Sequence, residues 1–318
     1  MSVIIPLILL VVGFVALILG ANWLVNGATS VGIRAKLSPL LIGLTIVAFG
    51  TSLPEMIVNV FSCAKGSPGL AIGNIIGSNT MNILLILGVS ALVWPIDVSR
   101  ISIRRDIPVG FVATLAITLM ANYFFTEKAH TINWIEGVVL LVMGIGYLLL
   151  TILKKDPQED IEGAQQAMPW GKTILSLVFG IAGLWIGGEL VSDNAQILAR
   201  NWGMSESTIG LTIVATATSL PELITSVVAA LKKNSGIAIG NVLGSNIMNI
   251  FMVLGVSALI TPLPFDPKMN QELMILFAAN ILMLIFVFTG KGHKISRWEG
   301  ALLTLGYVGF MWFSLLVK

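Results

Sequence analysis

Long, uninterrupted apolar runs decide what this chain can fold into. A membrane-spanning helix needs about 20 consecutive apolar residues, and the sequence offers ten such runs. The runs are roughly Val3–Thr29, Pro39–Ala64, Gly69–Val93, Ile107–Phe125, Ile132–Leu153, Thr173–Asp193, Thr208–Leu231, Gly236–Ile260, Leu273–Thr289 and Trp298–Val317. Charged residues make up only 11% of the chain, against roughly 25% in soluble domains. We therefore predict an all-α integral membrane protein with ten transmembrane helices, and exclude a water-soluble enzyme, a disordered chain and a nucleic-acid-binding protein.

Cysteine and histidine are too scarce to build a site for a soft metal. Cys63 is the only cysteine, so no intramolecular disulfide and no cysteine-based zinc site can form. His130 and His293 lie singly among polar residues. Zinc, copper and iron, which prefer sulfur or imidazole ligands, are therefore poor candidates.

Basic residues are distributed unequally between the two sides of the predicted membrane. Thirteen of the 18 Lys and Arg residues fall on loops of one side, namely Arg34, Lys36, Arg100, Arg104, Arg105, Lys154, Lys155, Lys172, Lys232, Lys233, Lys291, Lys294 and Arg297. The other five are Lys65, Lys128, Arg200, Lys268 and Lys318. Loops rich in Lys and Arg stay in the cytoplasm. We therefore expect both termini to face outward from a plasma (inner) membrane.

The chain repeats itself after 167 residues. Gly43–Leu92 matches Gly210–Leu259 at 31 of 50 positions without a gap. We therefore expect a first five-helix repeat (1–153), a cytoplasmic linker (154–171) and a second five-helix repeat (172–318). Because five is odd, the second repeat enters the membrane from the opposite side. Inverted repeats around a midplane site are typical of secondary transporters, although a channel can share this symmetry.

One ionisable residue lies deep inside an apolar run of each repeat. Glu55 and Glu222 occupy equivalent positions, and no Lys or Arg shares the interior of their helices. A charged side chain in the membrane interior is costly and by default marks a functional site. We therefore favour a binding role for both glutamates over a buried ion pair.

A proline precedes each glutamate. Pro54 and Pro221 lack an N–H group, so each leaves a carbonyl one turn earlier without its donor and should break the helix. We expect the chain to be unwound or kinked at Thr51–Leu53 and at Thr218–Leu220. Broken helices of this kind hold cations in transporters.

Neutral oxygen donors accompany the two glutamates. They are Thr51, Ser52, Ser78 and Asn82, with their copies Thr218, Ser219, Ser245 and Asn249. On a helix, residues three or four apart share a face, so Ser52 and Thr51 are both predicted to share a face with Glu55. Asn79 and Asn246 are equally well explained by hydrogen bonds between helices. Glycines spaced four apart predict the close packing that would bring these oxygens together, and they are Gly73, Gly77, Gly240 and Gly244.

This set of donors suits hard cations. The two glutamates supply up to four oxygens, and freed carbonyls of Thr51 and Thr218 would add two. Calcium takes about six to eight oxygen ligands in flexible geometry, and neutral hydroxyls and amides suit sodium. Two carboxylates balance one Ca²⁺ or two Na⁺. We therefore expect Ca²⁺ and Na⁺ as transported ions, with no cofactor.

The motif TSLPE followed by GNxxGSNxxN, present in both repeats, resembles the calcium/cation antiporter superfamily and within it the prokaryotic sodium/calcium exchanger proteins. The resemblance covers nearly the whole chain. It implies exchange of Ca²⁺ against Na⁺ by alternating access, with the first and sixth helices sliding past a core of the second, third, seventh and eighth. The side-chain ligands it implies are Glu55, Glu222, Ser52, Ser219, Ser78, Ser245, Asn82 and Asn249. The backbone ligands it implies are the carbonyls of Ala48, Thr51, Ala215 and Thr218.

Two positions depart from the family pattern. Asn249 stands where many sodium/calcium exchangers carry an aspartate, and Ala217 replaces in the second motif the glycine found at Gly50 in the first. The first departure bears on sodium stoichiometry and on calcium affinity.

The residues leave other functions open. Membrane-buried glutamates can carry protons, so Ca²⁺/H⁺ exchange, or exchange that also needs K⁺, fits the same fold. A passive cation channel would need a continuous pore, which the kinks and the Gly-rich packing do not favour. Glu189 and Asp193, one turn apart near the outer end of the sixth helix, could line a funnel, but a helix end at the membrane interface is the preferred interpretation.

Overall fold

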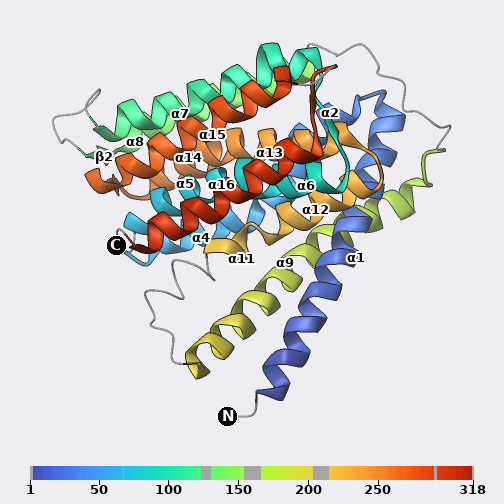
Figure 1. Ribbon diagram of the computed structural model, residues 1–318, viewed down its shortest axis with the longest axis horizontal. Helices are drawn as coiled ribbons and strands as arrows, with labels where there is room; N and C mark the ends of the chain where they lie inside the picture. The colour runs from blue at the N-terminus through green and yellow to red at the C-terminus, as the bar shows by residue number, and fades with distance from the viewer. Residues whose placement is uncertain are drawn as a thin grey trace.

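The computed structural model describes residues 3–66, 68–122, 130–153, 166–202, 215–289 and 292–316. The described part of the chain is overwhelmingly helical (Figure 1). Its α-helices are α1 (Ile4–Ala35), α2 (Pro39–Ile42), α3 (Ala48–Thr51), α4 (Leu53–Ala64), α5 (Gly69–Met81), α6 (Leu87–Val93), α7 (Ile107–Asn122), α8 (Trp134–Leu153), α9 (Trp170–Asn201), α11 (Ala215–Thr218), α12 (Leu220–Leu231), α13 (Ser235–Met248), α14 (Leu254–Ile260), α15 (Asn270–Thr289) and α16 (Arg297–Leu316). Four π-helical turns interrupt them at Gly43–Val47, Asn82–Ile86, Ser102–Asp106 and Asn249–Val253, and a 3₁₀ turn covers Pro267–Met269.

Six described helices are long and apolar enough to cross a membrane, and the bent pair Pro39–Thr51 and Leu53–Ala64 makes a seventh span. Helices α7, α12 and α16 occupy the three other apolar runs of the sequence. The beginning of the seventh run, residues 208–214, and most of the expected linker, residues 154–165, lie outside the described residues. The protein is therefore a mostly helical, multi-pass membrane protein.

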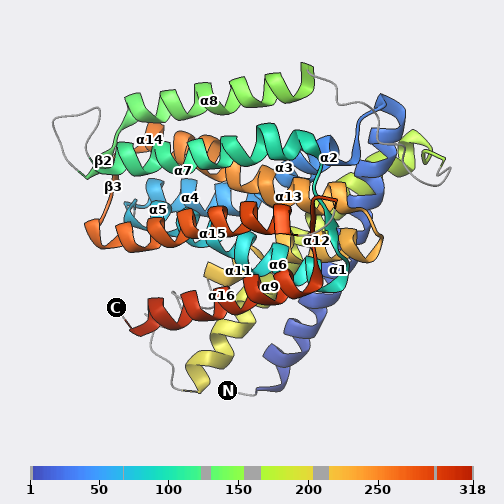
Figure 2. The same ribbon diagram turned by 45° about the horizontal axis from the view of Figure 1, so that its top comes forward.

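Helices α1 and α9 form an antiparallel pair that extends beyond the rest of the bundle (Figures 1 and 2). Each has 32 residues, so both exceed the predicted runs Val3–Thr29 and Thr173–Asp193. Glycines let their backbones touch, because a Cβ atom added at Gly20 would lie 2.7 Å from the backbone nitrogen of Leu184. Little hydrophobic driving force acts between helices inside a membrane. Small residues let the two backbones approach closely, so that van der Waals packing holds the helices together.

Two short strand pairs tie loops of the two halves together. β1 (Ile96–Asp97) pairs antiparallel with β4 (Lys294–Ile295), and β2 (Thr131–Ile132) pairs with β3 (Leu263–Pro264). Asp97 and Lys294 face each other in the first pair, where Oδ1 lies 2.9 Å from Nζ. The hydrogen bond and the negative charge of this carboxylate raise the pKa of the Lys294 ammonium group.

Helix α13 occupies the centre of the bundle. All its residues from Ile237 to Met248 are buried, and it packs against α2, α3 and α12. The predicted close packing is confirmed for its two glycines, since a Cβ at Gly240 would lie 2.6 Å from the carbonyl oxygen of Leu40 and one at Gly244 would lie 2.8 Å from Ala48 Cβ. For the other two glycines, a Cβ at Gly73 would lie 3.2 Å from Met269 Cε, and one at Gly77 would meet no described atom within 4 Å.

Candidate cation-binding site

Both predicted helix breaks are present. In the first repeat α3 ends at Thr51 and α4 begins at Leu53, with Ser52 between them at φ −84° and ψ 2°; the two helical segments meet at 42°. In the second repeat Ser219 separates α11 from α12 at φ −92° and ψ 5°. Proline at the second position of the following helix explains each break.

The two breaks lie against each other, and each serine contacts the glutamate of the other repeat. Ser52 Oγ donates to Glu222 Oε1 at 3.0 Å, and Ser219 Oγ donates to Glu55 Oε1 at 3.2 Å. Segments about 170 residues apart in the sequence are thus joined by a reciprocal pair of hydrogen bonds. Glu55 and Glu222 are both 0% exposed.

The hydroxyl groups of the next helices complete this cluster. Ser245 Oγ lies 3.0 Å from Ser52 Oγ, and Ser78 Oγ lies 3.1 Å from Ser219 Oγ. Ser245 also reaches Glu222 Oε1 at 3.5 Å. The structure therefore brings together six predicted residues, Glu55, Glu222, Ser52, Ser219, Ser78 and Ser245, and all six are buried.

Asn82 and Asn249 are buried as well, at 1% and 0% exposure. Each begins a π-helical turn, at Asn82–Ile86 and at Asn249–Val253. Their amide groups donate across the repeat boundary, Asn82 Nδ2 to Asn246 Oδ1 at 2.8 Å and Asn249 Nδ2 to Asn79 Oδ1 at 3.1 Å. Their own side-chain oxygens are left over.

Within this cluster, four buried oxygen atoms consequently have no hydrogen-bond donor in the described part of the chain. They are Glu55 Oε2, Glu222 Oε2, Asn82 Oδ1 and Asn249 Oδ1. An unsatisfied buried polar atom costs about 1–3 kcal/mol, and more when it is charged. No Lys, Arg or His is found among the buried residues described, so neither glutamate has a basic partner there. Buried oxygens that accept no hydrogen bond, present here as two repeat-related pairs, are the type of ligand that hard cations prefer.

The residues whose backbone carbonyls were predicted as ligands differ in their surroundings. Ala48 O already accepts from Ser52 N at 3.0 Å and from Thr51 Oγ1 at 3.3 Å. The Thr51 hydroxyl also reaches Asn241 Oδ1 at 3.0 Å, so it points to α13 and not to Glu55, whose helix face it was predicted to share. Thr218 is only half-buried, and the side chain of Ala215 lies outside the described set although its backbone begins α11.

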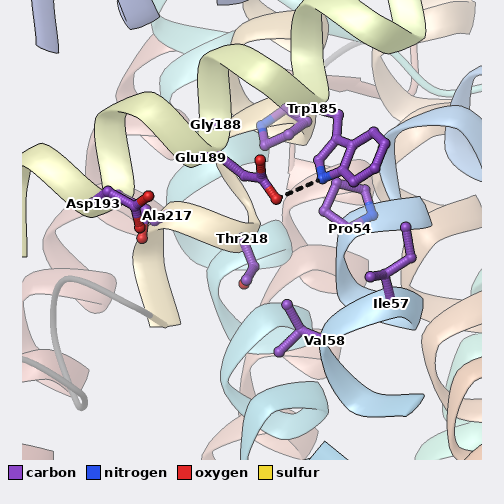
Figure 3. Close-up of a pocket in the computed structure, with 11 residues that line it drawn as sticks. Pro54, Ile57, Val58, Trp185, Gly188, Glu189, Asp193, Ala217 and Thr218 are labelled. Carbon is purple, nitrogen blue, oxygen red and sulfur yellow. Dashed lines mark hydrogen bonds between the residues drawn. The ribbon is translucent and has the colours of Figure 1, made fainter. Parts of the chain in front are cut away.

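A pocket of about 220 Å³ opens beside the two breaks. Pro54, Thr218 and Pro221 line it from the broken helices, and Glu189 and Asp193 line it from α9 (Figure 3). Trp185 Nε1 donates to Glu189 Oε1 at 3.0 Å within this pocket. The expected helix end is not found at these acids, because α9 continues to Asn201, and both acids line the pocket; their place at the membrane interface stays a prediction.

The comparison with known protein families decides between the classes of membrane protein that such a site allows. The family model described as sodium/calcium exchanger protein matches residues 5–153 and 172–316. The chain belongs to this family. It is accordingly a membrane antiporter and not an enzyme.

Known proteins and solved structures resemble this exchanger-family protein along nearly its whole length. Inner membrane protein YrbG of Escherichia coli is 34% identical, covering 97% of this chain and 95% of YrbG. Sodium/calcium exchanger MaX1 of Methanosarcina acetivorans is 29% identical over 96% of this chain and 97% of MaX1. A structure of the sodium-calcium exchanger NCX_Mj soaked with 10 mM Na⁺ and zero Ca²⁺ superposes with a TM-score of 0.82 at 32% identity, covering 96% of this chain and 98% of that one.

Sequence reasoning missed one polar residue of this exchanger-family site. Asn241 donates from Nδ2 to Ser226 Oγ at 2.9 Å and to the backbone oxygen of Glu222 at 3.3 Å, while its Oδ1 accepts from Thr51. It is the first asparagine of the GNxxGSNxxN motif, so the motif itself carried the signal. The π-helical turns at Asn82 and Asn249 have no evident signal in the sequence. Such turns are frequent at functional sites.

Proposed function

We propose that this protein is a secondary active antiporter that exchanges Ca²⁺ for Na⁺ by alternating access. Ten membrane spans in two inverted five-helix repeats, 1–153 and 172–318, would hold the ions between them near the membrane midplane. The proposal is supported chiefly by four buried oxygens that have no hydrogen-bond donor among the described residues, one each from Glu55, Glu222, Asn82 and Asn249. The sodium and calcium named for MaX1 and NCX_Mj agree with it.

Charge and ligand number favour these ions. Two carboxylates without a basic partner balance one Ca²⁺ or two Na⁺. The hydroxyls of Ser52, Ser219, Ser78 and Ser245 can turn their hydrogens away and offer lone pairs to a cation. Together with Asn82, Asn249 and the carbonyls of Ala48, Thr51, Ala215 and Thr218, they exceed the roughly six to eight oxygens that calcium needs. No cofactor is needed, because the driving force is the sodium gradient.

Access from one side at a time is supported by a difference between equivalent positions of α1 and α9. Lys232 Nζ donates to Asn26 Oδ1 at 2.7 Å and to the Asn22 carbonyl at 3.4 Å, and so ties the end of α12 to α1. Asp193 and Glu189 are the repeat copies of Asn26 and Asn22, and they line the pocket instead.

The positive-inside rule provides the orientation of this proposal. The loop that carries Lys232 and Lys233 is on the basic side and would be cytoplasmic. The pocket beside Glu189 would then face outward, as would both termini, across a plasma (inner) membrane.

The proposal is tested by ⁴⁵Ca²⁺ uptake into proteoliposomes under Na⁺, K⁺ or H⁺ gradients imposed one at a time. Uptake driven only by an outward Na⁺ gradient is the expected result. Uptake driven by protons alone, or only when K⁺ accompanies Na⁺, would instead assign the other couplings of this fold. Calcium flux without any counter-gradient would identify a channel and overturn the proposal.

A further inference from the structure

We infer that Asn79 and Asn246 are positioning residues that turn the side-chain oxygens of Asn249 and Asn82 toward the transported cation. The inference rests on the proposed function and deepens it, because it concerns how two neutral ligands are held. Both residues are buried, Asn79 at 1% exposure and Asn246 at 7%. They lie on α5 and α13, and each stands three residues before the asparagine that the other one orients.

The orientation of Asn79 and Asn246 is fixed by backbone carbonyls. Asn79 Nδ2 donates to the backbone oxygen of Asn246 at 3.0 Å, and Asn246 Nδ2 donates to that of Asn79 at 3.3 Å. A carbonyl oxygen can only accept a hydrogen bond. The NH₂ group of each amide must therefore face the opposite backbone, and its Oδ1 atom must face the other way.

This constraint passes on to the two proposed ligands. Asn79 Oδ1 can only accept, and it faces Asn249 Nδ2 at 3.1 Å; Asn246 Oδ1 likewise faces Asn82 Nδ2 at 2.8 Å. Turning Asn249 or Asn82 around would set two oxygens against each other. It would also aim an NH₂ group with partial positive charge at the cation. The network thus leaves Asn82 Oδ1 and Asn249 Oδ1 as buried acceptors without donors.

Simple adhesion between helices does not account for this pattern. The chain has an example of adhesion alone, where Asn122 and Asn270 of α7 and α15 bond each other reciprocally at 2.7 and 2.9 Å. Each amide of that pair bonds the other in both directions, and neither asparagine has a buried side-chain oxygen without a donor in the described part of the chain. The two hydrogen bonds between Asn79 and Asn246 would already join their helices without the amides of Asn82 and Asn249. The oxygens of Asn82 and Asn249 that remain without donors are explained by a role in positioning ligands.

The test is ⁴⁵Ca²⁺ binding to purified full-length protein in detergent, with Na⁺ absent and then present as competitor. Loss of a residue that orients a metal ligand typically lowers metal affinity about 10- to 100-fold. We expect a loss of that size in Asn79→Ala and in Asn246→Ala. Because Asn79 acts through Asn249, adding Asn79→Ala to Asn249→Ala should cost little more, and the same should hold for Asn246 and Asn82.

Asn122→Ala is the matched control, since it also breaks an asparagine pair between two helices. It should lower thermal stability and leave Ca²⁺ affinity unchanged. Asn79→Leu, close in size, replaces the alanine variant if that protein does not fold. Calcium affinities equal to wild type, or losses that add fully in the double variants, would overturn the inference. A wild-type protein that binds neither ion would overturn the proposed function itself, and so is distinguished from failure of the positioning role alone.

Discussion

At the scale of single residues, the site is distinguished by buried oxygen atoms that have no hydrogen-bond donor in the described part of the chain. Each of these glutamates, Glu55 and Glu222, accepts a hydrogen bond from a serine of the other repeat with one oxygen, and its second oxygen has no donor among the described residues. The residual charge of each carboxylate is therefore available to a cation. Glu136 also leaves one buried oxygen without a donor among the described residues, but its other oxygen accepts from the backbone nitrogen of Asn133 at 2.7 Å, so it caps α8 and does not join the two repeats.

We expect Glu55→Gln and Glu222→Gln each to abolish calcium transport while the protein still folds. Either change removes half of the negative charge at the site, in surroundings where an uncompensated ionic charge is severely disfavoured. ⁴⁵Ca²⁺ uptake by reconstituted protein measures the effect, and size-exclusion chromatography verifies the fold. Glu136→Gln is the matched control and should change stability only. Normal exchange in either site variant would show that glutamate to be structural.

The residue types of the site were predictable from the sequence, and their contacts were predictable only in part. Glutamate next to proline in an apolar run is unusual enough to stand out locally, and the repeat doubled the signal. The crossing of Ser52 to Glu222 and of Thr51 to Asn241 joins segments about 170 to 190 residues apart. Helical spacing gives no information on such pairs, which is why Thr51 was predicted to face Glu55 and the role of Asn241 was missed.

At the scale of elements, local backbone chemistry explains the broken helices but not the π-helical turns. A missing N–H group breaks a helix wherever it occurs, so both breaks could be predicted from Pro54 and Pro221. A π-helical turn depends on how the surrounding helices accommodate an extra residue, and no single residue in Asn82–Ile86 or Asn249–Val253 requires it. The ends of α1 and α9 escaped prediction for a similar reason, since polar residues continue both helices beyond their apolar runs.

Pro54→Ala and Pro221→Ala should each reduce transport although both favour a regular helix. Alanine restores the missing N–H group and gains about 3 kcal/mol in helix propensity, which would let the helix close over the carbonyls that the break exposes. Initial rates of Na⁺-driven Ca²⁺ uptake measure the loss. Pro267→Ala, in an exposed turn outside the site, should transport like wild type. The role given to the broken helices fails if both site variants keep full activity.

Gly20→Ala should destabilise the protein by about 1–3 kcal/mol, the cost of overpacking a close contact. The new Cβ atom would lie 2.7 Å from Leu184 N and 2.9 Å from Gly180 O, and a backbone cannot move aside as a side chain can. Thermal unfolding in detergent gives the difference. Gly146→Ala in α8, where no described atom lies within 4 Å of the new Cβ, should be neutral or slightly stabilising. Equal stability of Gly20→Ala and wild type would show that the α1–α9 seam yields easily.

At the scale of the whole molecule, the net charge of the site bears on the electrical balance of a transport cycle. Asn82 and Asn249 are both neutral, so the carboxylates of Glu55 and Glu222 supply a charge of −2. One Ca²⁺ or two Na⁺ match that charge, whereas a third Na⁺ would bring an uncompensated charge into the membrane interior. Exchange should therefore be closer to electroneutral than in relatives that carry an aspartate at the position of Asn249.

Asn249→Asp should move the exchange ratio toward more sodium per calcium, because the added carboxylate compensates a further Na⁺. Reversal potentials in proteoliposomes at fixed Na⁺ and Ca²⁺ gradients, before and after the substitution, give the ratio directly. The same ratio and the same sodium dependence in both proteins would contradict the charge argument. That outcome would indicate that an aspartate at this position is protonated and behaves as the asparagine does.

The length of the α1–α9 pair makes the bilayer itself a variable of the transport cycle. A helix of 32 residues is about 48 Å long, whereas the hydrocarbon layer of a membrane measures about 30 Å. Both helices must therefore tilt steeply or protrude, and their glycine seam makes them tilt as one body. A thinner bilayer favours a larger tilt. We expect the turnover rate in proteoliposomes to change with lipid acyl-chain length while Ca²⁺ affinity stays constant, so that the cell could adjust ion flux through the thickness of its membrane.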